Sequence, residues 1–271
     1  ECIRRYDLGL KDVFGGEQIG VHRHTWSYMV LDKKDHWLFK DIIKDYVLVG
    51  DMSYEFLKMR VSPALGWQII IRPSTGKTLA YIGLAGGFWG YEYTLGRSPP
   101  PCIGKLDNPS ILINRYGDGE SIYFAWQVGR HYWRTGLPEY LLLIRNAVQG
   151  LAGKPMVEVD APETVDVGVF RQGDRIIVHL LNHTYNQRIL ATGIGKVRQP
   201  LPPYSSSEAV HPIREVIPID NIVVRLNRSG EYRAYMPLRN RYLDARMEND
   251  WIEVSIPRLG EYEVVVFEKT K

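Results

Sequence analysis

The acidic side chains of this sequence do not form a recognisable catalytic pair. Hydrolysis of a glycosidic bond needs two carboxylates on either side of a sugar, usually at the ends of barrel strands. The most conspicuous acids are Glu120, in a predicted turn, and Glu139, at the start of a predicted helix, where a carboxylate suits the positive end of the helix dipole. We therefore expect neither acid to be catalytic.

The chain has two cysteines, Cys2 and Cys102, that could act as nucleophiles. A nucleophile elbow places Ser or Cys between glycines on a sharp turn from a strand into a helix. Neither G-x-S-x-G nor G-x-C-x-G occurs; Cys2 lies in a basic segment without glycine, and Cys102 follows three prolines. We therefore expect no catalytic residue. Two cysteines also leave the cellular compartment undecided, with a reducing cytoplasm slightly favoured.

Histidines and glycines give weak signals for a metal or a phosphate. His22 and His24 could lie on one face of a strand, with His36 further along, and such a pair can bind zinc. No third ligand follows at a supporting spacing, so solvated or hydrogen-bonded histidines are the favoured interpretation. The glycine-rich run 83–87 is not followed by the Gly-Lys-Ser or Gly-Lys-Thr of a phosphate loop. The sequence therefore predicts no metal site and no cofactor.

Aromatic residues that carry a polar group suggest ligand binding more strongly. The chain has 17 Tyr and 7 Trp against 7 Phe, a composition that suits sugar-stacking surfaces, subunit interfaces and ordinary cores alike. The stretch 85–105 is rich in Gly, Pro and aromatic residues and has no periodicity, which predicts a long loop. Its residues Trp89, Tyr91 and Tyr93 are candidates for a platform on which a sugar would stack.

A second candidate cluster, residues 129–134 (GRHYWR), lies between a predicted strand and a predicted helix. In an α/β domain this place is the carboxyl end of a strand, where ligands collect. The candidate ligand-binding residues are His131, Tyr132, Trp133 and Arg134. The favoured alternative is that Tyr132 and Trp133 pack the helix onto the sheet or form a subunit contact.

Composition places the chain among folded globular proteins. Its 271 residues are 45% hydrophobic and 24% charged, with a formal net charge of +3, and they suffice for one large domain or two ordinary ones. No apolar run approaches the roughly 18 to 20 residues of a membrane span, and no basic stripe predicts a nucleic-acid partner. The start at Glu1 lacks a Met and a signal peptide, so we expect the middle of a longer chain.

Residues 1–153 are predicted to mix helices and strands. The segment 137–151 has apolar residues on one broad face, Pro138 at a first helical position and Gly153 just past the end, which predicts a helix. A shorter helix is expected over 6–14, where two glycines would end it. This part of the chain is therefore expected to be an α/β domain.

The strands of this first part are predicted from runs rich in β-branched and aromatic residues. A hairpin is expected around residues 116–120, whose glycines permit the positive φ angles of a tight turn. The expected strands cover residues 26–31, 46–49, 67–71, 78–84, 110–114 and 121–126.

Beyond Gly153 the pattern becomes all-β. Short strands follow one another between Asn, Gly, Asp and Pro turns, and apolar and polar residues alternate, as in 251–256. This pattern predicts a β-sandwich. We therefore expect two domains, residues 1–153 and 154–271. The strands expected in the second cover residues 165–170, 175–182, 222–226, 233–236, 251–256 and 261–267.

Several short runs, taken in order, resemble a known family. In the first part they are residues 114–119, 123–124, 129–133, 138–140 and 146–148. These are similar to the glutamine-amidotransferase-like domain, also called the β-galactosidase trimerisation-like domain, which follows the catalytic barrel in β-galactosidase-related glycosyl hydrolases. In the second part, the runs 157–162, 169–174, 179–182, 216–218 and 256–259 resemble the C-terminal β-sandwich of the same family.

The resemblance implies an incomplete flavodoxin-like, amidotransferase-like domain over residues 1–153, followed by a sandwich over 154–271. It implies a non-catalytic C-terminal part of a glycoside hydrolase, which acts in oligomerisation and in shaping the sugar site. The implied partners are the N-terminal catalytic barrel of the same parent chain and further copies in a homo-oligomer. Two alternatives stay open: a carbohydrate-binding module and, less favoured, an amidotransferase-like hydrolase.

Overall fold

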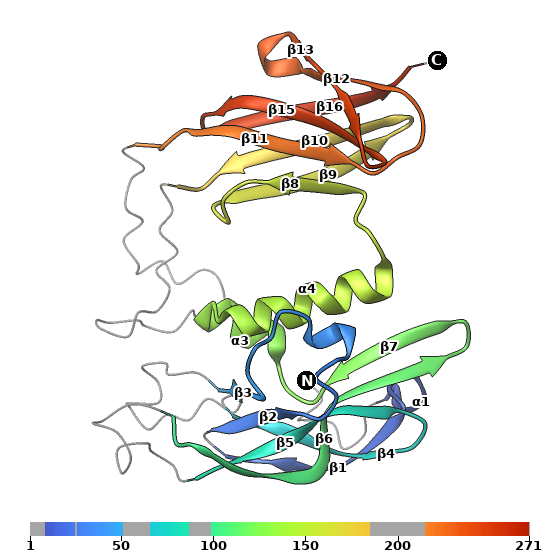
Figure 1. The fold of residues 1–271 in the computed structure, drawn as a ribbon, viewed down its shortest axis with the longest axis vertical. Coiled ribbons are helices and arrows are strands. Elements are labelled where there is room, and N and C mark those ends of the chain that lie inside the picture. The colour runs from blue at the N-terminus through green and yellow to red at the C-terminus, as the bar shows by residue number, and fades with distance from the viewer. Residues whose placement is uncertain (1–8, 25, 51–65, 87–98, 185–214, 271) are drawn as a thin grey trace. The chain divides into compact units, whose positions relative to one another are not determined.

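The protein forms two compact units built mainly from strands (Figure 1). The computed structural model describes residues 9–24, 26–50, 66–86, 99–184 and 215–270. In this part of the chain the first unit ends at Gly153 and the second begins at Lys154. No helix of the described residues is long and apolar enough to cross a membrane.

The main sheet of the first unit has five strands, all paired with antiparallel neighbours. The predicted hairpin is confirmed, because β6 and β7 pair across a turn in which Gly117 has a φ of +57°. In sheet order the strands are β3 (Tyr46–Val49), β2 (Ser27–Leu31), β5 (Lys77–Ala85), β6 (Cys102–Tyr116) and β7 (Gly119–Phe124).

A two-stranded antiparallel ribbon packs on one face of this sheet. It consists of β1 (Gly16–His22) and β4 (Gln68–Pro73). Ile69 and Ile71 of β4 are buried against Leu112 of β6 and Tyr123 of β7. The ribbon therefore closes a small core of its own.

A single helical turn, α1 (Lys11–Phe14), precedes this ribbon and ends at Gly15. Gly15 has a φ of +72°, and a Cβ atom there would lie 2.4 Å from the backbone nitrogen of Gly76. Only glycine fits both constraints without strain. The end of the predicted helix is therefore confirmed, but Gly9 and Leu10 are not helical, so the prediction of a helix over these two residues is wrong. The residues before Gly9 lie outside the described part of the chain.

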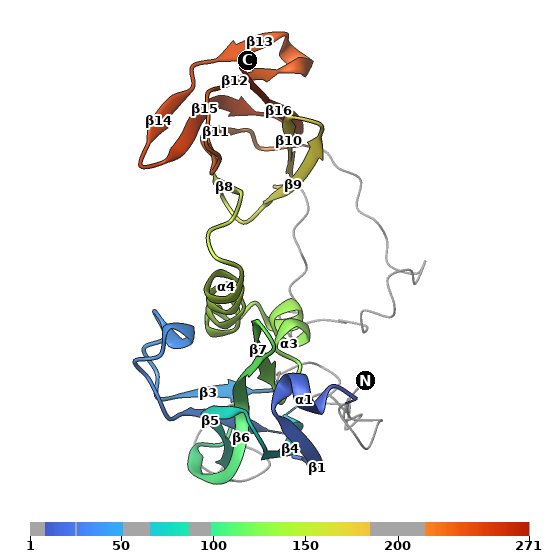
Figure 2. The same ribbon diagram turned by 90° about the vertical axis from the view of Figure 1, so that its right-hand side faces the viewer.

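Helices cover the other face of the five-stranded sheet. They are α3 (Val128–Thr135), α4 (Pro138–Ala152) and a 3-10 turn, η1 (Trp37–Phe39). In Figure 2, α4 is seen end-on beside the sheet. The prediction of α4 is confirmed, including Pro138 in its first turn and Gly153 at its C-terminal cap.

The core beneath these helices comes from alternate residues of the sheet and one face of α4. Met29, Leu79 and Ile111 of the sheet are buried against Tyr140 and Leu143 of α4. The alternation follows from the two-residue period of strand side chains, which puts every second residue on the same face. Burial of this apolar area supplies the main favourable free energy of packing.

The structure changes several expectations for the first unit. The resemblance implied a flavodoxin-like sheet of parallel strands, which need helical crossovers. The described sheet is antiparallel, and α3 and α4 follow each other without an intervening strand, so a flavodoxin-like part is not shown. The predicted loop 85–105 is also too long at its C-terminal end, because β6 begins at Cys102.

The second unit consists of two antiparallel sheets (Figures 1 and 2). Their orders are β13-β12-β16-β10-β9 and β14-β15-β11-β8. A 3-10 turn, η3 (Pro237–Arg239), leads into β13. The strands are β8 (Val157–Asp160), β9 (Val165–Gln172), β10 (Arg175–Asn182), β11 (Ile219–Leu226), β12 (Tyr232–Met236), β13 (Arg241–Leu243), β14 (Arg246–Glu248), β15 (Trp251–Leu259) and β16 (Tyr262–Lys269).

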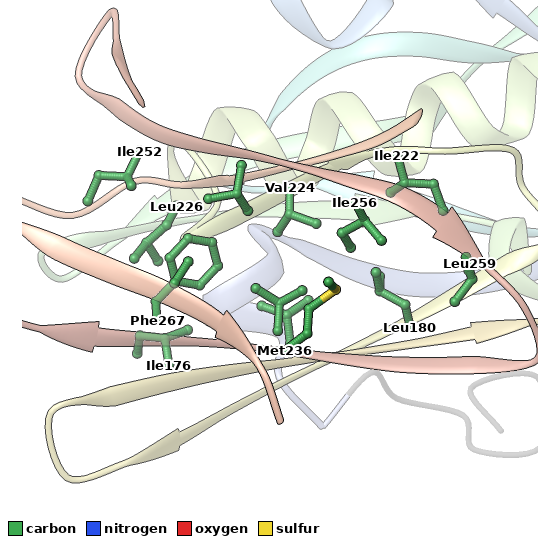
Figure 3. Packing of buried hydrophobic residues seen from close by; sticks show 14 of the residues in the cluster. Ile176, Leu180, Ile222, Val224, Leu226, Met236, Ile252, Ile256, Leu259 and Phe267 are labelled. Atoms are coloured by element: carbon green, nitrogen blue, oxygen red, sulfur yellow. The ribbon is translucent and has the colours of Figure 1, made fainter. Parts of the chain in front are cut away.

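Side chains from both sheets meet in a single apolar core (Figure 3). The strands β10, β11 and β15 contribute every second residue to it, which is the spacing that the sequence predicted. The prediction of a β-sandwich is consistent with this arrangement, since two inner faces interdigitate and the outer faces are left outside the core. The contributing residues include Ile176, Val178 and Leu180 of β10, Ile222, Val224 and Leu226 of β11, Ile252, Val254 and Ile256 of β15, and Phe267 of β16.

Candidate ligand-binding end of the first unit

One end of the first unit brings together the strand ends that flank its two longest connections, residues 50–67 and 86–101, and the short connection 23–26. Antiparallel neighbours run in opposite directions, so the start of one strand lies beside the end of the next. The strand termini at this end, which we call the loop-bearing end, are His22 of β1, Ser27 of β2, Val49 of β3, Gln68 of β4, Ala85 of β5 and Cys102 of β6.

A buried polar network holds these strand ends together. The Gln68 amide nitrogen donates to Ser27 Oγ at 2.9 Å and to the backbone oxygen of Tyr28 at 2.8 Å. The Ser110 hydroxyl donates to Gln68 Oε1 at 2.6 Å, and the Ser27 hydroxyl donates to the backbone oxygen of Gly66 at 2.6 Å. A buried network with its hydrogen bonds made fixes positions more strongly than apolar packing alone. It therefore joins β2, β4 and β6 rigidly at this end.

The segment that carries Trp89, Tyr91 and Tyr93 starts and finishes here. These three residues lie outside the described part of the chain, but its flanks are well defined. Ala85 pairs with Cys102, and the backbone nitrogen of Gly86 donates to the backbone oxygen of Pro101 at 2.9 Å. The interpretation of these aromatic residues as a stacking platform therefore stays a prediction.

Tyr28 lies beside these flanks and is the most perturbed titratable group of this end. Its hydroxyl donates to the backbone oxygen of Pro100, and the Tyr46 ring packs edge-on against it at 5.4 Å between centroids. Burial, with smaller contributions from Cys102 and Tyr46, raises the pKa of Tyr28 to about 12. Tyr28 is therefore a neutral hydrogen-bond donor at physiological pH.

The thiol of Cys102 has a raised pKa, whereas a cysteine nucleophile is expected to have a lowered one. Burial raises the pKa of its thiol, against a smaller opposing effect of the backbone at Gly104. Reactive cysteines instead have a lowered pKa, because the thiolate is the attacking species. Cys102 is therefore a protonated thiol at neutral pH, and Cys2 lies outside the described residues.

The histidine pair predicted from the sequence does come together at the same end. The rings of His22 and His24 stack with centroids 6.1 Å apart, and the Arg23 guanidinium lies 5.2 Å from the centre of the Trp67 ring. Burial first, and His24 second, lower the pKa of His22. His36 instead caps η1. In the described part of the chain, no group of three or more His, Cys, Asp or Glu side chains is placed to hold a metal ion.

The second sequence-predicted cluster forms the helix α3 and separates into a buried and an exposed part. His131 is 1% exposed and lies against Trp126 and Tyr140, with ring centroids 5.7 and 6.0 Å away. Tyr132 packs partly buried against the same core, whereas Trp133 is 66% exposed. For Arg134, the side chain lies outside the described structure. Burial makes His131 a core residue of this helix rather than a surface ligand group.

Tyr140 connects this cluster to the loop-bearing end. Its hydroxyl donates to the backbone oxygen of Leu48 at 2.6 Å and lies 3.3 Å from that of Gly50, where β3 has ended. Sequence reasoning missed Tyr28 and Trp67 as members of this end, and it missed Tyr46, which begins β3 at the opposite end and whose ring contacts Tyr28. Their strands were predicted, but a sequence without pairing information does not show which strand ends meet.

The described residues at this end can stack on a ligand and form hydrogen bonds with it, and Arg23 adds a cationic donor. Aromatic rings with polar groups suit the apolar faces and hydroxyl edges of sugars, whereas glycosidic hydrolysis requires a pair of carboxylates. The described residues that we place at this end supply aromatic, amide, hydroxyl, imidazole, thiol and guanidinium groups. Stacking and hydrogen bonding are therefore the interactions that these groups offer to a ligand.

Comparison with known proteins gives likeness in fold and none in sequence. No family model matches, and no curated protein matches in sequence. The structure of α-L-fucosidase isoenzyme 2 from Paenibacillus thiaminolyticus is similar over 95% of this chain, with 16% identity and a TM-score of 0.63. The chain thus shares the fold of a part of that enzyme, of which it covers 34%.

Two β-galactosidases are more distant in structure. The enzyme from Bacillus circulans sp. alkalophilus has 15% identity over 96% of this chain, and that from Rahnella sp. R3 has 12% identity over 96%. Both have a TM-score of 0.47, and this chain covers 25% of each. The chain therefore spans about a third or less of the length of these solved structures.

Proposed function

We propose that this chain is the non-catalytic C-terminal portion of a multidomain glycoside hydrolase, in which it shapes the sugar site and takes part in oligomerisation. The parent enzyme in this proposal is β-galactosidase-like and carries its catalytic barrel before residue 1. The partners are that barrel and further copies of the same chain.

One observation carries the proposal. Nearly the whole chain, 95%, matches a part of a fucosidase, yet it covers only 34% of that enzyme. A likeness of this kind is expected of an accessory region that accompanies a larger catalytic domain. The likeness to the fucosidase concerns the fold alone. The sugar, the glycosidic linkage and the oligomeric state of the parent enzyme are therefore proposed.

The loop-bearing end is the surface that we assign to shaping the sugar site. Three connections leave the strand ends there, and loops positioned by a rigid scaffold are the usual carriers of binding function. The network around Gln68 supplies the rigidity, and Tyr46 supplies a ring that is nearly half exposed. We expect this end to face the substrate of the parent enzyme.

The alternative function is a carbohydrate-binding module that uses Trp89, Tyr91 and Tyr93. The short hydrogen-bonded stem formed by Gly86 and Pro101 favours it, because a stem of this kind would hold such a platform. An amidotransferase-like hydrolase is the least favoured alternative, since the raised pKa of Cys102 opposes a thiolate there.

The test begins with the DNA upstream of the Glu1 codon, which should encode an in-frame barrel. The complete parent should hydrolyse an aryl galactoside or fucoside, and the 271-residue chain alone should not. Within the parent, Tyr46→Ala should raise KM several-fold while kcat changes little, because it removes substrate contacts and no reacting group.

Tyr116→Ala is the matched control, since Tyr116 is another exposed tyrosine and lies in the β6–β7 turn. Sedimentation velocity of the parent with and without this region measures its part in oligomerisation. Turnover by the isolated chain, or an upstream sequence without a catalytic domain, would overturn the proposal.

A further inference from the structure

The outer face of the five-stranded sheet in the second unit carries an apolar row that crosses every strand. The strand register places these residues on one face, because directly paired residues of neighbouring strands point to the same side of the sheet. Ile177 pairs with Phe170 and with Val266, and Tyr235 pairs with Val266 and with Tyr242. These five residues, which we call the outer row, alternate with core residues of the same strands, so they point away from the core.

The outer row ends in exposed aromatic rings, and the side chains between them are less exposed. Phe170 on β9 is 60% exposed and Tyr242 on β13 is 63% exposed, whereas Val266 between them is buried. Five neighbouring strands span about 19 Å at the usual spacing of about 4.8 Å. The two rings therefore stand at opposite ends of a band wide enough for a short chain of sugar rings.

Neighbouring residues set the position of each terminal ring. Gly168 leaves room for Phe170, because a Cβ atom at residue 168 would lie 3.3 Å from Phe170 Cε2. The Phe170 ring also packs edge-on against His179, at 5.1 Å between centroids. Tyr242 lies 5.7 Å from the Tyr235 ring. The rings are therefore held in place before any ligand arrives, which reduces the entropy lost on binding.

A row of hydrogen-bonding groups runs beside the outer row. Arg175 pairs with Glu268, which in turn pairs with Arg233, on the same face and two residues further along each strand. Arg175 Nη2 donates to Glu268 Oε1 at 2.6 Å, and Arg233 Nη2 donates to Glu268 Oε2 at 2.6 Å. Nε of each arginine also donates to the same carboxylate oxygen as its Nη2, so Glu268 accepts four hydrogen bonds and fixes the two guanidinium groups in place. We call these three residues the charged row.

We propose that the outer row and the charged row together bind a saccharide chain that lies across the strands. The apolar C–H faces of the sugar rings stack on Phe170 and Tyr242. The hydroxyl groups of the sugar accept hydrogen bonds from the remaining N–H groups of Arg175 and Arg233, because each guanidinium has five N–H donors and uses two of them on Glu268.

The charged row is the reason to prefer a saccharide to a second copy of this chain. A protein surface that covered Arg175, Glu268 and Arg233 would remove three charges from water, and this desolvation is costly. Sugar hydroxyls replace the lost water hydrogen bonds and leave the row partly solvated. The choice of a saccharide also rests on the proposed function, since the parent enzyme would act on sugars. The arrangement of the outer row and the charged row does not depend on that function.

The test is affinity electrophoresis of the 271-residue chain in gels that contain soluble galactan, xyloglucan or arabinoxylan. At least one of these polysaccharides should retard the chain. Phe170→Ala and Tyr242→Ala should each weaken that binding about tenfold, which corresponds to about 1.4 kcal/mol. Tyr116→Ala, an exposed tyrosine of the first unit, should leave the retardation unchanged.

Three outcomes would overturn the inference. The first is that none of the polysaccharides retards the wild-type chain. The second is that both variants bind as well as the wild type, in which case the saccharide binds elsewhere. The third is that sedimentation velocity shows a dimer that Phe170→Ala converts to a monomer without any polysaccharide binding. A failed parent-enzyme assay would refute the proposed function and leave this binding result intact.

Discussion

The hydroxyl of Tyr140, on α4, donates to the backbone oxygen of Leu48, on β3, at a distance of 2.6 Å. Two segments more than ninety residues apart in the sequence are thereby fixed to each other at the loop-bearing end. Tyr140 is also fully buried among Trp126 and His131. The Tyr140 ring packs in the apolar core, and its hydroxyl fixes the position of α4 relative to β3 through the hydrogen bond to Leu48.

We predict that Tyr140→Phe lowers the free energy of unfolding by about 1 to 3 kcal/mol, because a buried carbonyl group loses its donor while the ring is kept. Urea denaturation followed by circular dichroism measures the change. Tyr116→Phe, in an exposed turn, should leave stability within about 0.5 kcal/mol of wild type. Equal effects of the two substitutions would show that the Tyr140 hydroxyl has no role in stability.

We predict that replacement of Gly150 and of Gly129 by alanine has opposite effects on the stability of the protein. A Cβ atom at Gly150 on α4 would lie 2.1 to 2.5 Å from atoms of the Trp37 ring, whereas one at Gly129 on α3 would meet nothing within 4 Å. Alanine is favoured over glycine in helices by up to about 1 kcal/mol. Gly129→Ala should therefore stabilise the protein by up to that amount.

Gly150→Ala should destabilise the protein by about 1 to 3 kcal/mol, because the Trp37 ring must move and an overpacked site costs that much. Thermal unfolding of both variants measures the contrast, and tryptophan fluorescence reports the displacement of Trp37. Stabilisation by both alanines would show that Trp37 moves at no cost.

Much of the second unit follows from its sequence, since strands such as β15 alternate apolar and polar residues between turn residues. The period of two assigns each side chain to the core or the outside without knowledge of the partners. The helix α4 was equally predictable, because its apolar face, Pro138 at its start and Gly153 after its end all predict the same helix. Local signals of this kind need no information from distant parts of the chain.

The remainder depends on pairings between segments far apart in the sequence. The ribbon of β1 and β4 joins Gly16 to Pro73, and nothing local at either segment specifies the other. The helix α3 is not predicted from the sequence, because its eight residues are too few for a clear period. The loop-bearing end was likewise hidden, since it exists only once antiparallel pairing places Ser27, Gln68 and Cys102 together.

The stability of the first unit should fall as the pH decreases below about 6.5, in part because of His22. Burial first, and then His24, lower the pKa of His22 in the folded protein relative to its ordinary value of 6.5. Below pH 6.5 the unfolded chain therefore takes up a proton more readily than the folded protein does, which favours unfolding. The effect stops growing once the pH drops below the folded pKa.

Titration by NMR of the imidazole signals measures this directly. His24→Gln should raise the pKa of His22, yet leave it below 6.5, because the larger cause is burial. His179→Gln, in the second unit, should not change it. A wild-type His22 that titrates at 6.5 or above would contradict the prediction.

Arg239 and Glu263 form the ion pair whose loss should be most costly in the second unit. The Glu263 side chain is 1% exposed, and Arg239 Nε donates to Glu263 Oε2 at 2.6 Å. The other carboxylate oxygen accepts from the backbone nitrogen of Val264 at 3.0 Å. Arg239→Met would remove the neutralising charge and leave a buried carboxylate, which costs about 3 to 5 kcal/mol.

The double variant Arg239→Met with Glu263→Gln separates this effect from the loss of packing. It should recover more than half of the lost free energy of unfolding, because the remaining amide is neutral and can still accept a hydrogen bond from Val264. Arg241→Met, on the exposed strand β13, is the control and should change stability by less than about 0.5 kcal/mol. Urea denaturation of the wild type, Arg239→Met, Glu263→Gln and the double variant gives the coupling free energy. If the double variant were as unstable as Arg239→Met alone, the arginine would stabilise the sandwich through its aliphatic stem rather than through its charge.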